Sequence, residues 1–242
     1  MATSDLPLHE QNVANIVQKA KEFLGPILDD PSILVEHGTI LYSSCETLKK
    51  GKYYFLGLNP GGTDADGPTI RESLDDLRFY KGNAYLPEDK KADWSSPPRR
   101  CYLPGEHPYQ QAFRILFEEF GEDPRTVCAS NLIFKRSAGA RSAGYPKLAK
   151  RCWPVHKAML EIVQPEAIIA FGKQAFDFVA QQLGDGTFHD IEVRPGFWSW
   201  KHSMLKGDMP LIGVRHPSWY PLKRSVAGEI REFLGPIIRR HA

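Results

Sequence analysis

An apolar run that ends at an Asn-Pro-Gly-Gly sequence constrains the fold of this 242-residue chain more than any other stretch. Residues 53–58 are all aliphatic, aromatic or glycine, which leaves no polar face and predicts a buried parallel strand. Residues 59–62 cannot continue that strand, because proline lacks the N–H and glycine frees the backbone. The chain therefore leaves the C-terminal end of the strand in a tight loop that carries one polar side chain, Asn59. Open α/β sheets bind ligands at this edge, although a plain Asn-Pro-Gly turn fits the same residues.

The rest of the chain alternates between apolar runs and amphipathic helical segments. Further strands are predicted at 127–134, 167–172 and 210–215, a hairpin at 188–200, and helices at 11–28, 109–120, 147–163, 173–183 and 224–238. Each connection between strands is long enough to contain a helix, which is what parallel pairing requires. The pattern predicts an α/β fold, a three-layer α/β/α sandwich around a parallel sheet of about four strands.

We expect a single domain over 1–242, with an N-terminal helical extension at 1–50 and a long loop insertion at 63–108. The insertion is rich in Asp, Gly, Pro and Arg. A loop of this length beside a site is either a functional lid or partly disordered.

The composition argues against a membrane or secreted protein. The chain is 42% hydrophobic and 25% charged, no apolar run approaches a bilayer span, and the N-terminus lacks a signal-peptide pattern. Its four cysteines show no paired spacing, and neither Cys-x-x-Cys nor His-Glu-x-x-His occurs. We therefore expect reduced thiols, no metal, no cofactor and no membrane partner, in a protein that is cytoplasmic (nucleoid-associated) or nuclear rather than secreted.

Positive charge is concentrated in two stretches, although the net charge is only +2. Residues 129–160 hold seven Lys or Arg and no acid, and residues 201–242 hold eight against three acids. A basic face points to a polyanion, and a solvated lysine-rich surface is the alternative. Within the first stretch, Arg-Ser-Ala-Gly occurs twice, beginning at Arg136 and at Arg141. This loop suits phosphate contact, and it could equally be a disordered connector.

Polar side chains stand at or near the ends of three predicted strands: Asn59, Asn131 and His216. The C-terminal ends of parallel strands share one edge, so these groups are expected to converge on one pocket. Asn131 interrupts an otherwise apolar strand. A buried amide must be hydrogen-bonded, so Asn131 is either a structural tether or a reader of a polar ligand.

Two motifs carry a resemblance to a known family. Gly57-Leu58-Asn59-Pro60-Gly61, followed much later by His216-Pro217-Ser218, resembles the two signature motifs of the uracil-DNA glycosylase superfamily. It is most similar to the branch with Gly-x-Asn-Pro-Gly, which includes single-strand-selective and mismatch-specific enzymes. Residues 130–132 and 164–173 are similar to the middle of that superfamily, so the resemblance covers about 51–222. Each motif is short, and their order and strand-end context give the combination its specificity.

The resemblance implies a monomeric, monofunctional DNA N-glycosylase of base excision repair, free of metal and cofactor, that removes uracil or another deaminated or damaged base. Asn59 would orient the attacking water, His216 would donate a hydrogen bond to the leaving base, and Asn131 would read the edge of the flipped base. Gly57 and Leu58 would line the base pocket, and Tyr102 would stack on the base.

The resemblance also implies how the chain holds DNA. Trp219, Tyr220 and Leu222 would supply a wedge that fills the gap left by the flipped base, although core packing is the alternative for the two aromatic residues. The implied DNA contacts come from two loops and comprise Arg136, Arg141, Ser218, Lys223 and Arg224.

The chain departs from the family pattern at Gly62, at Trp219 and in the length of the 63–108 loop, and these departures concern the substrate rather than the fold. Its cysteines lack the spacing of the iron–sulfur branch.

Two other functions remain open on sequence grounds. One is a non-catalytic nucleic-acid-binding protein on the same fold. The other is a nucleotide enzyme that uses 57–62 as a phosphate loop, although Gly-x-Gly-x-x-Gly and Gly-Lys-Ser/Thr are both missing.

Overall fold

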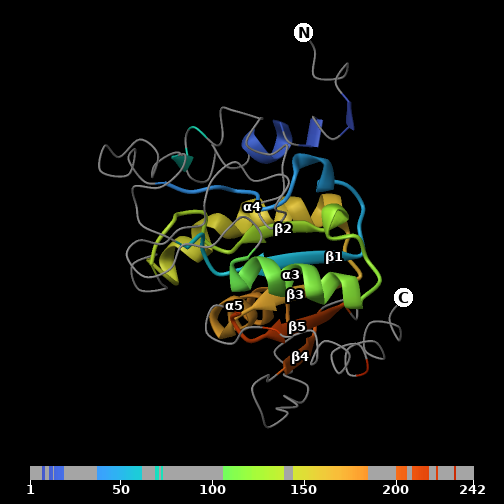
Figure 1. The fold of residues 1–242 in the computed structure, drawn as a ribbon. Coiled ribbons are helices and arrows are strands. Elements are labelled where there is room, and N and C mark those ends of the chain that lie inside the picture. The colour runs from blue at the N-terminus through green and yellow to red at the C-terminus, as the bar shows by residue number, and fades with distance from the viewer. Residues whose placement is uncertain are drawn as a thin grey trace.

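The predicted α/β class is confirmed by a computed structural model, which describes residues 7–8, 11–12, 14–18, 37–61, 69–70, 72, 106–138, 144–184, 200–205, 209–217, 222 and 232. Its centre is a five-stranded sheet with strand order β2-β1-β3-β5-β4 (Figure 1). Four strands are parallel: β1 (Tyr53–Gly57), β2 (Cys128–Asn131), β3 (Ala167–Phe171) and β5 (Pro210–Val214). The fifth, β4 (Trp200–Met204), is antiparallel to β5 at one edge.

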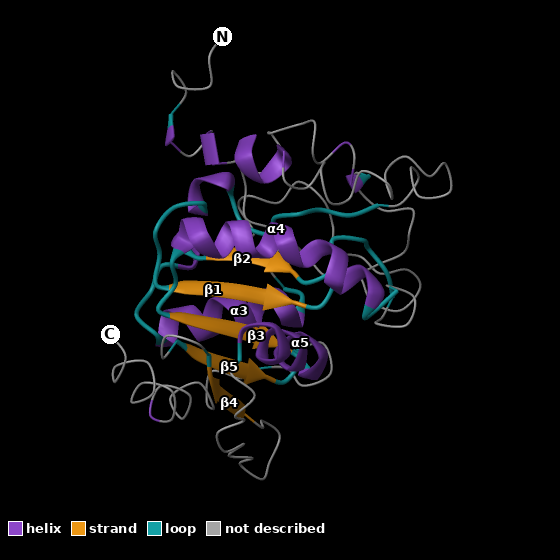
Figure 2. Cartoon of the chain, turned by 180° about the vertical axis from the view of Figure 1, so that it is seen from behind, coloured by secondary structure: helices purple, strands orange, loops and turns teal. Residues whose placement is uncertain are grey.

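Helices cover both faces of the sheet. Helix α3 (Pro108–Glu119) lies on one face, and α4 (Lys147–Val163) and α5 (Lys173–Leu183) lie on the other (Figures 1 and 2). The side chains of β1 alternate between the two layers, since Tyr53 and Phe55 pack with α3 whereas Tyr54 and Leu56 pack with α4 and α5. Burial on both faces explains why the central strands have no polar side in the sequence.

Several elements begin and end where the sequence predicts, and others do not. Helices α4 and α5 have the predicted bounds, and α4 continues through Pro154. The strand predicted at 127–134 is shorter, because β2 ends at Asn131 and the chain then follows the exit of β1. There the N–H groups of Leu132 and Ile133 donate to the carbonyls of Gly57 and Leu58 at 2.9 and 2.8 Å.

Strand β4 was not predicted, because Trp-Lys-His-Ser-Met has the mixed polarity that an edge strand tolerates. The hairpin predicted at 188–200 and the helix predicted at 224–238 lie almost entirely outside the described residues. Of the predicted first helix, residues 11–12 and 14–18 are helical and Ile16 is buried. None of the described helices combines the length and the apolar character that crossing a bilayer requires.

Part of the predicted N-terminal extension belongs to the core. Residues 40–43 run along β2, where the N–H of Tyr42 donates to the carbonyl of Ala129 at 2.8 Å and the hydroxyl of Ser130 donates to the carbonyl of Ile40 at 2.6 Å. The short 3-10 helix η2 (Cys45–Thr47) then leads towards β1. This segment covers the outer edge of β2, so the edge is not left open to a second chain.

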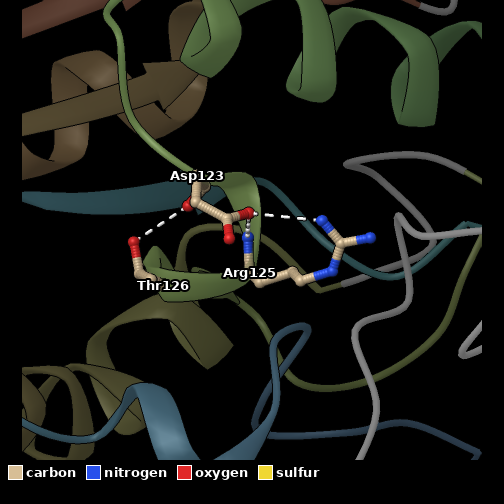
Figure 3. A network of polar contacts seen from close by, with 3 residues as sticks. All are labelled: Asp123, Arg125 and Thr126. Atoms are coloured by element: carbon tan, nitrogen blue, oxygen red, sulfur yellow. Dashed lines mark hydrogen bonds and ion pairs between the residues drawn. The ribbon is translucent and has the colours of Figure 1, made fainter.

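A capped turn, η4 (Pro124–Thr126), connects α3 to β2. The Asp123 carboxylate accepts from the Arg125 N–H at 2.9 Å and from its guanidinium at 3.4 Å, and the Thr126 hydroxyl donates to the Asp123 carbonyl at 2.8 Å (Figure 3). Side-chain caps of this kind satisfy backbone groups that a short helix leaves open. The turn thereby fixes the direction in which the chain enters β2.

A buried histidine joins α4 to the sheet. His156 is fully buried, its Nδ1 lies 2.7 Å from the Tyr54 hydroxyl on β1, and its Nε2 lies 3.3 Å from the carbonyl oxygen of Leu132. Burial lowers the pKa of His156 from 6.5 to about 4, because the imidazolium would lose its hydration. The neutral imidazole is therefore the form that holds α4 against Tyr54 of β1 and against Leu132, just past the end of β2.

The pKa of His156 predicts that acid weakens the fold. The unfolded chain takes up this proton near pH 6.5 and the folded chain only near pH 4, so the free energy of unfolding falls as the pH drops through this interval. The expected loss is about 1.4 kcal/mol per pH unit and about 3 kcal/mol in all. Urea denaturation of the wild type and of His156→Gln at several pH values measures it. Equal pH dependence in the two proteins would contradict the prediction.

Candidate active site

The three strand-end polar residues lie at the same edge of the sheet. Gly57 pairs with Asn131, which places the end of β1 beside the end of β2. Phe171 pairs with Val214, which places the end of β3 beside the end of β5, and His216 follows two residues later. All four strands are parallel, so the structure brings the exits of β2, β1, β3 and β5 side by side, as the sequence predicts.

Hydrogen bonds donated by its amide nitrogen hold the Asn59 side chain in one orientation. Its Nδ2 donates to the carbonyl of Pro60 at 2.9 Å, to the carbonyl of Ser137 at 2.8 Å and to the hydroxyl of Ser137 at 3.0 Å. Within the described part of the chain, its Oδ1 accepts no hydrogen bond. The half-buried side chain thus keeps its oxygen as the group left to bind water or a ligand.

The loop that carries Asn59 is tied to the segment after β2. The N–H of buried Ser137 donates to the carbonyl of Pro60 at 3.0 Å, and the Arg136 guanidinium donates to the carbonyl of Gly61 at 2.8 Å. The sequence predicted Arg136 as a phosphate contact, and here one of its nitrogens braces this loop. Ser137 was missed because a serine in a loop carries no distinguishing pattern.

The Asn131 side-chain amide is buried, and part of its hydrogen-bonding capacity is unused among the described residues. The residue is 3% exposed, and its Nδ2 has no hydrogen-bond partner among the described residues. Most buried polar groups in proteins are paired, so an exception calls for an explanation such as a ligand. The tether interpretation accounts less well for this nitrogen than the interpretation as a ligand reader.

Tyr109 lies between the two halves of the site, and the sequence did not identify it as a site residue. Its ring centroid lies 5.3 Å from that of Phe171 and 5.8 Å from that of His216. At the other side, its hydroxyl lies 2.6 Å from where a Cβ on Gly57 would stand. The signal was available, because the first turn of a crossover helix lies at the edge where the preceding strand ends.

The first turn that holds Tyr109 is fixed by a capping box. The Tyr109 N–H donates to the His107 ring nitrogen at 3.2 Å, and the His107 N–H donates to the Gln110 side-chain oxygen at 3.3 Å. Reciprocal capping fixes the start of α3, and with it the direction of the Tyr109 ring.

His216 is packed against backbone and ring. A Cβ on Gly172 would stand 3.7 Å from His216 Cδ2, an ordinary van der Waals distance, so His216 lies directly beside the exit of β3. Burial lowers the pKa of His216 below 6.5 by desolvating the charged form. A neutral imidazole, which donates through one nitrogen and accepts through the other, is therefore the form at neutral pH.

The remaining predicted residues divide into those described and those that lie outside. Leu58 is half-buried and packs against the α4 side of the core. Leu222 is buried in the core beside α3, so its prediction as part of a wedge is wrong. Tyr102, Arg141, Ser218, Trp219, Tyr220, Lys223 and Arg224 lie outside the described residues. In the described ranges, no group of His, Cys, Asp and Glu side chains is placed to hold a metal ion.

The contact between Gly57 and Asn131 predicts a sharp difference between glycines. A Cβ on Gly57 would stand 2.3 Å from Asn131 Oδ1, whereas a Cβ on Gly61 would meet nothing within 4 Å. Gly57→Ala is expected to lower the free energy of unfolding by about 1–3 kcal/mol. Gly61→Ala, the matched control in the same loop, should change it by less than about 0.5 kcal/mol. Urea denaturation measures the free energy of unfolding of both variants. Equal losses would show that the contact between Gly57 and Asn131 is not tight.

Comparison with known proteins adds no relative to this picture. No protein-family model matches the chain, and no curated protein matches it either. What the chain does must therefore follow from the side chains gathered at the C-terminal edge of its sheet.

Proposed function

We propose that the chain is a monofunctional DNA N-glycosylase that hydrolyses the N-glycosidic bond of uracil or another deaminated or damaged base. The observation that carries the proposal is the Asn131 amide, which is 3% exposed. Among the described residues, its nitrogen has no hydrogen-bond partner. The amide stands at the same edge as an oriented amide, Asn59, and a neutral imidazole, His216. The same three residues carry the resemblance to the uracil-DNA glycosylase superfamily.

In this proposal, Asn131 recognises the base. A primary amide carries donor hydrogens on its nitrogen and lone pairs on its oxygen, which matches a carbonyl next to a ring N–H on a pyrimidine. Such an edge is paired inside a duplex, so the nucleotide must leave the base stack to reach the pocket. Tyr109 then provides an aromatic floor between the base reader and His216.

Water positioning falls to Asn59. Because three acceptors hold its nitrogen, its oxygen is free to accept a hydrogen bond from a water molecule. An amide is a poor base, so it orients the water beside an oxocarbenium-like sugar carbon rather than removing a proton at the start. Bracing by Ser137 and Arg136 supplies the fixed geometry that this role needs.

Stabilisation of the leaving base falls to His216. When the bond between C1′ and the base nitrogen breaks, both electrons leave with the base, which becomes an anion. A hydrogen bond donated by the neutral imidazole stabilises the charge as it develops. The water oxygen then bonds to C1′, and its proton ends on the released base. The products are the free base and an abasic sugar.

The first test uses oligonucleotides that contain uracil, hypoxanthine, xanthine or 5-hydroxymethyluracil. Alkali after incubation cuts the strand at abasic sites, so cleavage reports base release. On the preferred base, Asn59→Ala should lower the single-turnover rate about 100-fold by loss of water orientation. His216→Ala should lower it about 100- to 1,000-fold by loss of one donor to the developing charge.

Asn12→Ala is the matched control, since the Asn12 amide nitrogen donates to the carbonyl of Leu48 at 2.6 Å on another part of the chain. Its rate should equal that of the wild type. If a folded wild-type protein releases none of the four bases, the enzyme proposal is wrong. If Asn59→Ala and His216→Ala keep full activity, the roles given to these side chains are wrong.

The pH dependence provides a separate test of His216. Its pKa lies below 6.5, so the imidazole should stay neutral, and the rate should show no step at pH 6.5. The ratio of the wild-type rate to the His216→Ala rate should therefore stay level from about pH 8 down to about pH 6.5 and change only at lower pH. Single-turnover rates across this range measure the ratio. A ratio that changes between about pH 7 and 8 would contradict the neutral role.

A further inference from the structure

Helix α4 is longer than the strands it covers. Its last residue lies level with the start of β1, because the Gly51 N–H donates to the carbonyl of Val163 at 2.9 Å. His156 lies level with the end of β2, because its Nε2 is 3.3 Å from the carbonyl oxygen of Leu132. Residues 147–155, about 13 Å of helix, therefore lie beyond His156 towards the C-terminal edge of the sheet. Figure 2 shows α4 extending beyond the arrowheads of β1 and β2.

This projection, the α4 overhang (residues 147–155), presents a cationic face. Lys147, Lys150 and Arg151 are spaced three and four residues apart, which places them on one side of the helix. The first turn holds no acid, and the nearest acid within the helix is Glu161, at the other end. Lys147 and Lys150 are both exposed.

Two other exposed lysines each have a carboxylate partner. Lys52 lies 2.6 Å from Glu122, and Lys173 forms an ion pair with Asp177 one turn along α5. In the described ranges, neither Lys147 nor Lys150 makes an ion pair. Their charge is therefore available to an external anion. Asn131, whose buried nitrogen has no hydrogen-bond partner in the described part of the chain, lies at the end of β2 that the overhang passes.

We propose that the α4 overhang binds the phosphate backbone of the DNA strand that flanks the nucleotide held at Asn131. The inference rests on the proposed function and adds to it the side of the site along which the strand runs. Lys147 and Lys150 are separated by about 4.5 Å along the helix axis, and each strand of a DNA duplex carries one charge per 3.4 Å or so of the duplex axis. Two lysines at this spacing fit neighbouring phosphates.

The test compares two double variants with the same change in charge. Lys147→Gln/Lys150→Gln alters the overhang. Lys49→Gln/Lys50→Gln alters two exposed lysines that precede β1, at the opposite edge of the sheet. Fluorescence anisotropy with a labelled single-stranded oligonucleotide containing uracil gives the dissociation constant at several salt concentrations. Each lost phosphate contact should lower the slope of log affinity against log salt by about 0.7.

The overhang variant should therefore lose about 1.4 from this slope, and the opposite-edge control should lose almost nothing. The opposite-edge control should also release base at the wild-type rate, because Lys49 and Lys50 belong neither to the proposed DNA-binding surface nor to the candidate active site. Thermal denaturation confirms that both variants are folded. Equal slopes for the two variants would overturn the proposed placement.

The outcomes separate the two proposals. If the wild type releases no base but the slopes still differ, the glycosylase proposal fails and the overhang remains a DNA-binding surface. If the wild type releases base and the slopes are equal, the glycosylase proposal stands and the overhang is a solvated helix face.

Discussion

The close approach of β1 and β2 at Gly57 and Asn131 governs the geometry of the whole site. These residues pair across the sheet, and Asn131 Oδ1 occupies space that a Cβ on Gly57 would need, at 2.3 Å. The backbone pairing then continues past both strands, from Leu132 to Gly57 and from Ile133 to Leu58. Because the two loops stay in register, Ser137 reaches the Asn59 amide and fixes it. One missing side chain therefore permits the arrangement of both amides.

Burial on both faces of the sheet sets the chemistry as well as the shape. Desolvation lowers the pKa of His156, which ties α4 to the sheet, and of His216, which lies at the candidate site, so both are neutral at pH 7. The same effect raises the pKa of the buried Cys128 and Cys152 thiols to about 12. Thiols held in their protonated form are poor nucleophiles, so neither Cys128 nor Cys152 is a candidate nucleophile.

The sequence predicts elements well where one physical signal dominates and poorly where contacts between distant segments decide. Helices α4 and α5 have their predicted bounds because their apolar periodicity is uninterrupted. Asn59, Asn131 and His216 were found because strand ends place them. Tyr109 and Ser137 were not, since Tyr109 owes its role to packing against Phe171 and His216, and Ser137 to a hydrogen bond across 78 residues of chain. Strand β4 was not predicted because an edge strand needs no apolar pattern.

The two amides of the site differ in a way that bears on selectivity under the proposed function. The Asn59 N–H₂ group donates to three protein acceptors, whereas the buried N–H₂ group of Asn131 has no acceptor among the residues that the structure describes. An unsatisfied buried donor costs about 1–3 kcal/mol, and only a ligand with an acceptor at that position removes the cost. Uracil presents a carbonyl there, whereas cytosine presents an amino group, which would place two donors against each other. A site built to pair a polar group rejects a ligand that cannot pair it far more strongly than an apolar pocket rejects a methyl group. Asn131 should therefore contribute chiefly to the choice of base.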